Sequence, residues 1–371
     1  MQIEILETKV LYENAHGAHN YVGWPTVARL RDGKLMMAAS GFRVRHVCPF
    51  GKSIACFSYD EGKTWTPPTV IIDTLLDDRD SGVLPFGESS VMVMSLSDSM
   101  EYNREFYQMT EGHPRFPRFG RYKAYVNAYI DLVENEANLN EFLGSNFRVS
   151  HDNGLTFGPI HQCPPMIPHG PCLLPDGTIF GMGNTREDGI HYDRSLSGYR
   201  IDPEGEWELV SKLNADDYFD RNVIPCEPHV IVTQSGKMIV QFRVENSNMS
   251  VKTTYQCESY DLGKTFTAPH RLFADDTGAA PTHIIQHSGG ALISVYAWRK
   301  DRGIDAMIST DDGETWEQGF PIYRNEELLD WSYPSSCELS DGSILTVFYA
   351  DPEGEPNSKN TKIMQVKWRL V

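Results

Sequence analysis

Two residues whose side chains could do acid–base chemistry each stand directly before a proline: Glu227 before Pro228, and Tyr333 before Pro334. An apolar, strand-like run follows each of them. The start of a core strand more often carries small or apolar residues, so a carboxylate and a phenol at matching positions point to work on a bound ligand rather than to packing. A carboxylate within hydrogen-bond reach of a phenol can take its proton, because a phenol otherwise keeps it up to a pKa of about 10.

Other polar and aromatic residues share this position ahead of an apolar run. They lie in the segments 19–24, 78–80, 169–171, 227–229, 282–283 and 331–334. From these segments we expect four further side chains to contact a ligand: Trp24, His169, His229 and Trp331. The histidines match no zinc-ligand spacing, so we expect no metal and no other cofactor.

The elements that must position these residues are read from an internal repeat. Five segments have an apolar run on both sides of a turn glycine, and a weaker sixth centres on Gly87; the five glycines are Gly33, Gly177, Gly236, Gly289 and Gly342. In four of these segments a proline stands eight residues before the glycine, at Pro25, Pro228, Pro281 and Pro334. Because proline is tolerated where strands begin, each predicts the start of a blade's innermost strand. The five segments and the weaker sixth together predict six blades.

A second repeat supports this count. Four segments share the pattern S-x-D-x-G-x-T-[W/F], at residues 58–65, 150–157, 259–266 and 309–316. The Asp and Ser side chains can bind backbone amides of a tight turn, Gly supplies a positive φ, and the aromatic residue fills the space between sheets. The four serines are spaced by about two, two and one units of roughly 50 residues, which is the length of a four-stranded blade.

The repeats together predict an all-β, six-bladed β-propeller that spans residues 1–371 as a single domain. The long interval between the second and third turn glycines holds an insertion around 98–121, which we expect to be a loop over one face. A helical period is visible only at 131–142.

Composition excludes several partners. The chain has 33 Lys and Arg against 51 Asp and Glu, a formal net charge of −18, which disfavours binding to phosphate backbones or anionic lipid surfaces. We therefore expect neither nucleic acid nor a membrane as partner. Seven cysteines without a CxxC pair favour free thiols over a disulfide framework. No basic start followed by an apolar stretch is visible, so we expect a cytoplasmic protein, or a secreted one if a signal segment has been removed.

The four turns, known as Asp-boxes, together with six strand-turn repeats over nearly the whole chain, resemble the sialidase (neuraminidase) superfamily of six-bladed propellers. The resemblance is specific for fold and not for chemistry, because Asp-boxes are structural turns on the outer rim that also occur in binding proteins. It implies that function lies at the mouth of the central channel, near the starts of the innermost strands.

Sialidases use a tyrosine nucleophile with a glutamate partner, three arginines that bind the substrate carboxylate, and an aspartate as acid and base. The resemblance implies that Tyr333 is the nucleophile, that Glu227 is its partner, and that Arg243 is the second arginine, with Arg299 or Arg302 as the third. A neutral nucleophile avoids repulsion by a substrate carboxylate, and arginine recognises that carboxylate in a planar, bidentate manner.

The chain departs from the sialidase pattern at three positions. It reads Val22-Gly23-Trp24-Pro25 where the first arginine would precede Ile-Pro, and the segment 41–52 contains no acidic residue where the aspartate is expected. Tyr349 or a neighbour stands where the glutamate that supports the first arginine is expected. The joint loss of the arginine and its supporter indicates a changed pocket.

Substitutes for the missing groups are available nearby. Arg43 and Arg45 could supply positive charge, or could be solvated surface residues. His46, Asp78 or Asp80 could serve as the acid, since histidine titrates near neutral pH and Asp78 and Asp80 precede the second innermost strand.

Three functions remain open from the sequence. The first is an exo-acting glycoside hydrolase that releases a terminal acidic sugar, either sialic acid or a related keto-acid or uronate. The second is a histidine-based glycosidase or uronate lyase, and the third is a non-catalytic glycan-binding propeller. In each case the partner is a small-molecule or oligosaccharide ligand. The sugar, the linkage, the stereochemical outcome and the oligomeric state are not specified by the sequence.

Overall fold

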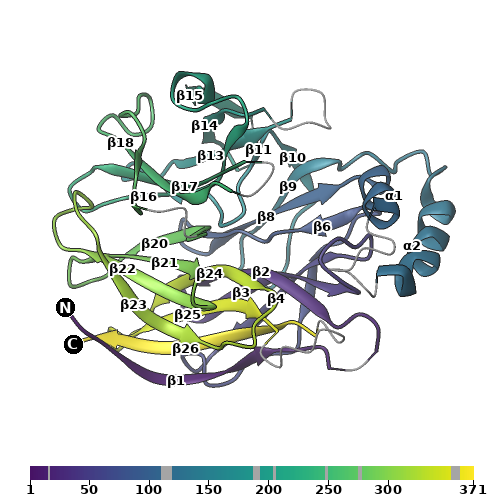
Figure 1. Cartoon of the computed structure of the whole chain (residues 1–371), viewed down its shortest axis with the longest axis horizontal. Helices are drawn as coiled ribbons and strands as arrows, with labels where there is room; N and C mark the ends of the chain where they lie inside the picture. Colours follow the sequence, from purple (N-terminus) through teal and green to yellow (C-terminus); the bar gives the residue numbers. More distant parts are fainter. Residues whose placement is uncertain are drawn as a thin grey trace.

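Six antiparallel sheets surround a central axis in the computed structural model of the chain (Figure 1). The structure describes all residues except 16, 110–118, 187–192, 204–205, 247–249, 275–277 and 352–359. The innermost strands contact one another in a closed ring, in the order β2, β7, β12, β16, β20, β24 and back to β2. The six-bladed propeller is therefore confirmed.

The strands have the following bounds. The first sheet contains β2 (Tyr21–Arg29), β3 (Leu35–Arg43), β4 (Lys52–Ser58) and β5 (Thr69–Ile72), and the second contains β6 (Asp77–Arg79), β7 (Val83–Phe86), β8 (Ser90–Asp98), β9 (Gly144–Ser150) and β10 (His161–Cys163). The third contains β11 (Pro165–Met166), β12 (Cys172–Leu173), β13 (Ile179–Thr185), β14 (Leu196–Ile201) and β15 (Trp207–Leu213), and a short 3-10 helix (Ala215–Asp217) follows it.

The remaining sheets each have four strands. The fourth contains β16 (Val223–Val232), β17 (Met238–Asn246), β18 (Lys252–Ser259) and β19 (His270–Arg271), and the fifth contains β20 (Thr282–Gln286), β21 (Leu292–Trp298), β22 (Gly303–Ser309) and β23 (Glu317–Arg324). The sixth contains β24 (Trp331–Glu338), β25 (Ile344–Ala350), β26 (Lys362–Leu370) and β1 (Ile3–Tyr12). The first strand of the chain thus pairs with the last, which closes the ring and brings the termini together (Figure 1).

The four S-x-D-x-G-x-T-[W/F] segments form the same hydrogen-bonded turn. In the last of them, Ser309 Oγ accepts the amide of Gly313 at 2.8 Å, and Asp311 accepts the amide of Thr315 at 2.9 Å. The residue before each turn glycine and the glycine itself both have positive φ, as at Asp312 (59°) and Gly313 (80°). Trp316 Nε1 donates to Gln256 in the neighbouring sheet at 2.9 Å. The aromatic residue therefore links adjacent blades.

We expect Asp311→Ala to destabilise the protein by about 1–2 kcal/mol, because it removes the acceptor of two hydrogen bonds from Thr315. Those hydrogen bonds lower the pKa of Asp311 to about 2 in the folded protein. The stabilisation that the ionised carboxylate gives is therefore complete above the unfolded pKa of about 4 and is lost as the pH falls towards 2. Urea unfolding at pH 7 and pH 3 measures both effects. Glu314→Ala should cost less than about 1 kcal/mol, because the Glu314 side chain is 65% exposed and Lys237 keeps Asp312 as a partner.

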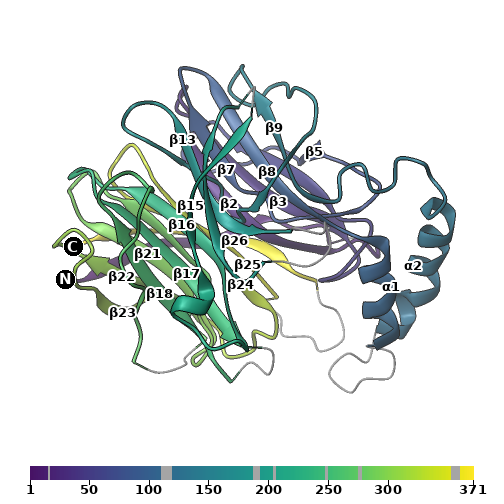
Figure 2. The ribbon, with the colours of Figure 1, turned by 90° about the horizontal axis from the view of Figure 1, so that it is seen from above.

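The insertion differs from the expectation of a loop. It contains α1 (Met100–Met109) and α2 (Phe119–Val133), which lie as a pair beside the sheets (Figures 1 and 2). The helix expected at 131–142 is wrong, because α2 ends at Val133 and turns follow. Tyr107 of α1 donates to the carbonyl of Val47 at 3.1 Å, and Tyr129 of α2 donates to that of Leu75 at 3.2 Å. The helices therefore support two loops that border the channel mouth.

All seven cysteines are buried and unpaired, as the sequence indicates. Within the described residues, neither helix combines the length and the apolar character that a membrane span requires.

Candidate active site

Four residues at the starts of inner strands share an unusual backbone conformation. Trp24, Asp80, Glu227 and Tyr333 have φ values of 54°, 46°, 51° and 54°. Trp24 of β2, Glu227 of β16 and Tyr333 of β24 each lie at a β-bulge, because the pairing register with the next strand shifts across them. A non-glycine residue in this region costs on the order of 1–3 kcal/mol, and such residues cluster at functional sites. This shared backbone conformation brings side chains from the first, second, fourth and sixth blades to one end of the channel.

Glu227 and Tyr333 are joined directly. The Tyr333 hydroxyl donates a short hydrogen bond to Glu227 Oε1, although the two residues are 106 positions apart in the sequence. The other carboxylate oxygen, Oε2, lies 2.8 Å from an Arg243 guanidinium nitrogen. Arg243 also binds Glu245 at 3.0 Å. The proton-sharing pair expected from the sequence is therefore assembled.

The protonation of this group follows from its burial. Burial raises the pKa of Tyr333 well above its usual value, and Glu227 raises it further, whereas Arg243 lowers it. Burial disfavours the charged form of Arg243, but Cys226, Glu227 and Tyr333 outweigh it and raise the pKa of the guanidinium. Tyr333 is therefore a neutral phenol whose proton has a carboxylate acceptor already in contact, and Arg243 remains a cation.

A group of cations lies on one side of this pair. Lys252 is 3.6 Å from Glu245, and its pKa is lowered to about 8 by burial and by Arg243 and Arg299. Arg299 donates to Ser332 Oγ at 3.2 Å, and its Nε is buried without a hydrogen-bond partner. Within the described residues no carboxylate pairs with Arg299, so its charge is available to a bound anion.

Arg302 has a different environment. Its guanidinium donates to the carbonyl of Glu326 at 2.6 Å in an exposed turn. Of the two candidates for a third arginine, the structure brings Arg299 to the site and leaves Arg302 outside it.

The two candidate aspartates have different surroundings. Asp80 is buried, its Oδ1 has no hydrogen-bond partner, and burial, together with Glu227 and Asp98, raises its pKa to about 7. Asp78 accepts hydrogen bonds from Thr74 and Ser97, and its pKa is raised to about 6 by burial. Asp78 therefore holds the loop before β6, whereas Asp80 interacts electrostatically with Glu227 and Tyr333.

Aromatic side chains also border the site. Trp24 lies between two guanidinium groups, with Arg43 at 4.8 Å and Arg79 at 4.7 Å from its ring centroid. Its ring is 4.9 Å from that of His46 and 6.4 Å from that of Tyr333. An aromatic ring, and not an arginine, thus stands at the start of β2.

His46 belongs to a hydrogen-bonded network with two tyrosines. Its Nδ1 lies 2.9 Å from the Tyr21 hydroxyl, which donates to Asp330 at 2.9 Å. Tyr349 donates to the other oxygen of Asp330 at 3.1 Å. The His46 side chain is 39% exposed, so its ring is accessible from solvent.

Three expected ligand-binding residues have structural surroundings instead. Arg43 is fully buried, pairs with Asp77 at 2.7 Å and donates to Ser40, so it positions Trp24. Arg45 is buried against the Tyr107 ring at 4.1 Å. The interpretation of Arg43 and Arg45 as solvated surface charges is wrong. Trp331 packs in the core between two sheets and donates to the carbonyl of Gly303 at 3.1 Å.

His169 and His229 lie inside the channel rather than at its mouth. The His169 ring is 5.9 Å from that of Tyr333 and 5.8 Å from that of His229. Both are buried, and they sit behind Tyr333 as seen from the mouth.

The sequence interpretation missed several residues that border the site. They are Tyr21, Arg79, Asp98, Arg186, Glu245, Lys252 and Asp330. Asp98 joins Arg79 at 3.3 Å and Arg186 at 2.7 Å, which connects the second and third blades. Arg79 directly precedes Asp80, so its position next to a candidate acid could have identified it from the sequence. Lys252 and Asp98 lie outside the expected strand starts, and only the fold brings them close.

The ring of six antiparallel sheets with Asp-box turns places the chain in the sialidase-like class of folds. A model of the BNR repeat-like domain matches residues 137–346, which is more than half of the chain. The chain therefore belongs to the BNR repeat-like family. A search of curated protein sequences finds no match.

Similar solved structures share the fold at low sequence identity. A protein of unknown function from Dyadobacter fermentans is 18% identical with a TM-score of 0.74, covering 100% of this chain and 99% of that one. The NanB sialidase from Streptococcus pneumoniae is 12% identical with a TM-score of 0.68, covering 98% and 70%. The GH93 α-L-arabinofuranosidase of Fusarium graminearum is 13% identical with a TM-score of 0.62, covering 96% of each chain. The fold is thus one that glycoside hydrolases of different substrates share.

Proposed function

We propose that the protein is an exo-acting glycoside hydrolase that releases a terminal acidic sugar, with Tyr333 as nucleophile and Glu227 as its base. The observation that carries the proposal is the hydrogen bond from the Tyr333 hydroxyl to Glu227, whose carboxylate also pairs with Arg243. A phenol of raised pKa needs such a base, because it cannot ionise alone near neutral pH.

In the first step of the proposed reaction the Tyr333 oxygen bonds to the anomeric carbon while its proton passes to Glu227. The glycosidic bond breaks, and the leaving oxygen takes a proton from Asp80. In the second step water attacks the anomeric carbon and gives a proton to Asp80, and the tyrosyl oxygen recovers its proton from Glu227. The sugar is released with both side chains restored.

The acidic character of the proposed sugar rests on Arg299. Its guanidinium has no carboxylate partner within the described residues, and its Nε is buried without a hydrogen bond. Lys252 and Arg243 lie near Arg299, but within the described residues Glu227 and Glu245 balance their charges. A substrate carboxylate would supply the partner that Arg299 lacks.

The proposal is tested with aryl glycosides of sialic acid, related keto-acids, uronates and a neutral sugar such as rhamnose. Release of the aryl group from an acidic glycoside, and not from the neutral one, supports it. Release from the neutral glycoside alone would contradict the acidic assignment.

Arg299→Met should lower kcat/KM for the acidic glycoside by about 10- to 100-fold, mainly through a higher KM, because a charge-assisted hydrogen bond is lost. Arg302→Met is the matched control, since Arg302 binds only a carbonyl in an exposed turn. Equal effects of the two substitutions in steady-state kinetics would remove Arg299 from the binding site.

Asp80→Asn should lower kcat by about 10²- to 10⁴-fold for an alkyl leaving group and much less for 4-nitrophenol, which leaves without a proton. An acid is active when protonated, and the pKa of Asp80 is about 7, so the wild-type rate should fall as the pH rises through about 7. That alkaline limb should disappear in Asp80→Asn and persist in Asp78→Asn. Its persistence in both would exclude Asp80 as the acid.

A histidine-based glycosidase or uronate lyase is the second candidate, and one observation favours it. His46 is exposed, and its Nδ1 is oriented by the Tyr21 hydroxyl, which is itself held by Asp330. A histidine oriented by a carboxylate network suits acid–base work. A lyase product carries a double bond that absorbs in the near ultraviolet, which a hydrolysis product lacks.

A further inference from the structure

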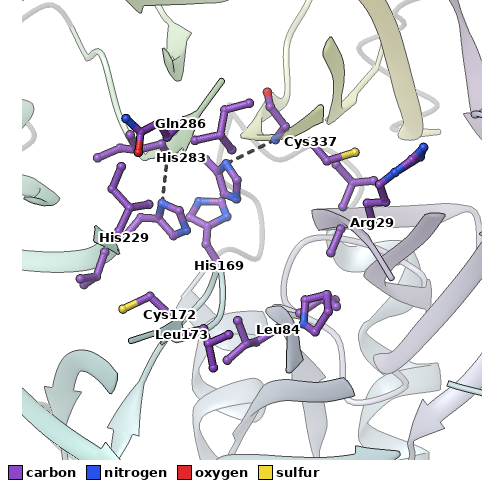
Figure 3. A pocket seen from close by; sticks show the side chains of 18 of the residues that line it. Arg29, Leu84, His169, Cys172, Leu173, His229, His283, Gln286 and Cys337 are labelled. Atoms are coloured by element: carbon purple, nitrogen blue, oxygen red, sulfur yellow. Dashed lines mark hydrogen bonds between the residues drawn. The ribbon is translucent and has the colours of Figure 1, made fainter. Parts of the chain in front are cut away.

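The other end of the propeller channel contains a cavity of about 440 Å³, which we call the lower channel cavity. Apolar residues such as Leu84, Leu173 and Ile285 line it together with the polar residues Arg29, Gln286 and Glu338, and the side chains of His169, His229 and His283 also line it (Figure 3). This volume lies within the range of small-molecule sites, which are mostly apolar with a few convergent polar groups.

The three histidines form a compact cluster. The His229 and His283 rings stack at 4.1 Å with an angle of 18° between them, and the His169 ring is 5.4 Å from that of His283 (Figure 3). His169 is 2% exposed, and neither of its ring nitrogens has a hydrogen-bond partner within the described residues. An unpartnered buried imidazole is costly, and an aromatic hydrocarbon would pack there without that cost.

The backbone sets which nitrogen of two histidines carries a proton. His229 Nδ1 accepts the amide of Ile284 at 2.9 Å, and His283 Nδ1 accepts that of Ser336 at 3.3 Å. Burial lowers the pKa of both rings well below the usual value, so each holds a single proton. Because Nδ1 is an acceptor, the proton lies on Nε2, and each ring offers one N–H donor.

This arrangement distinguishes between classes of ligand. A histidine that binds a metal through Nε2 donates its Nδ1 proton to an acceptor, whereas here Nδ1 faces backbone N–H groups. The aliphatic residues of the wall suit a hydrocarbon surface, and the charged wall residues Arg29 and Glu338 already have partners in Glu61 and Ser288. We propose that the lower channel cavity is a second binding site, for a compact ligand with an apolar body and an uncharged acceptor oxygen that receives the imidazole N–H groups.

Ligand-observed NMR titration of the full chain tests this with acetophenone and ethylbenzene, which have the same shape but differ in the carbonyl oxygen. Acetophenone should bind saturably, about 5- to 10-fold more tightly than ethylbenzene, and shift histidine ring resonances. His283→Phe should abolish this preference, whereas His270→Phe, the same change at an exposed position on β19, should retain it. Circular dichroism verifies that both variants fold.

Three outcomes would overturn the proposal. Absence of saturable binding would mean that the cavity holds solvent only. Equal affinity for the two probes would mean that no N–H donor is used. Tighter binding of benzoate than of acetophenone would assign the site to anions. If His283→Phe does not fold, the comparison of the probes and the histidine resonances of the unaltered protein still decide the question.

Discussion

Replacement of Tyr333 by phenylalanine is expected to reduce kcat for an acidic aryl glycoside by about 10³-fold or more while substrate binding persists. The substitution removes the oxygen that attacks the anomeric carbon and keeps the ring that contacts Trp24 and His169. Steady-state kinetics give the loss in kcat, and titration with the free sugar product gives the affinity.

A matched control separates catalysis from the loss of a hydroxyl group. Tyr260→Phe makes the same change at a side chain that is 70% exposed, and it should leave both kcat and KM unchanged. Full activity of Tyr333→Phe would exclude the tyrosine mechanism and favour the network of His46, Tyr21 and Asp330.

Glu227→Gln should reduce kcat by about 10²- to 10⁴-fold, because the amide can no longer take the Tyr333 proton. The substitution preserves the shape of the side chain, so the protein should fold. It also removes one of the two carboxylates on Arg243 and leaves Glu245 as its partner.

Glu245→Gln is the matched control for this change. It alters the charge beside Arg243 to the same extent but does not touch the Tyr333 hydroxyl. If Glu227 is the base, its substitution should lower kcat much more than that of Glu245. Equal losses would mean that both act only by holding Arg243, and the role of base would have to be assigned elsewhere.

Tyr333→Phe and Glu227→Gln together also separate the three functions that the sequence leaves open. Activity that both variants lose supports the tyrosine hydrolase. Activity that both retain favours the histidine-based glycosidase or lyase. Binding of an acidic sugar without turnover by the unaltered protein would make the chain a glycan-binding propeller.

The sequence by itself determined the architecture and the position along the inner strands at which the candidate site residues lie. The repeated turns depend on hydrogen bonds between residues within four positions of one another, as at Ser309 and Gly313. A short stretch of sequence is therefore enough to recognise each turn. The proline register placed Trp24, Glu227 and Tyr333 at equivalent bulges, because a blade repeats its own backbone. Asp80 occupies the same level without a following proline.

Only the tertiary structure decided which of several neighbours enters the site. Asp78 and Asp80 are two positions apart, yet Asp78 accepts hydrogen bonds from Thr74 and Ser97, whereas Asp80 lies close to Glu227. Arg299 and Arg302 differ in the same way. Contacts with other blades, as between Asp80 and Glu227 or between Arg299 and Ser332, bring the second aspartate and the first arginine to the site, and no local spacing encodes them.

The same reason explains the largest errors in the sequence interpretation. Arg43 and Arg45 were expected either to offer positive charge to a ligand or to be solvated, but Asp77 and the inserted helix α1 bury them. The cluster of His169, His229 and His283 draws one ring from each of three blades, and it exists only because the ring of blades closes. Repetition along the chain specified the blades, and the contacts between blades specified which side chains meet.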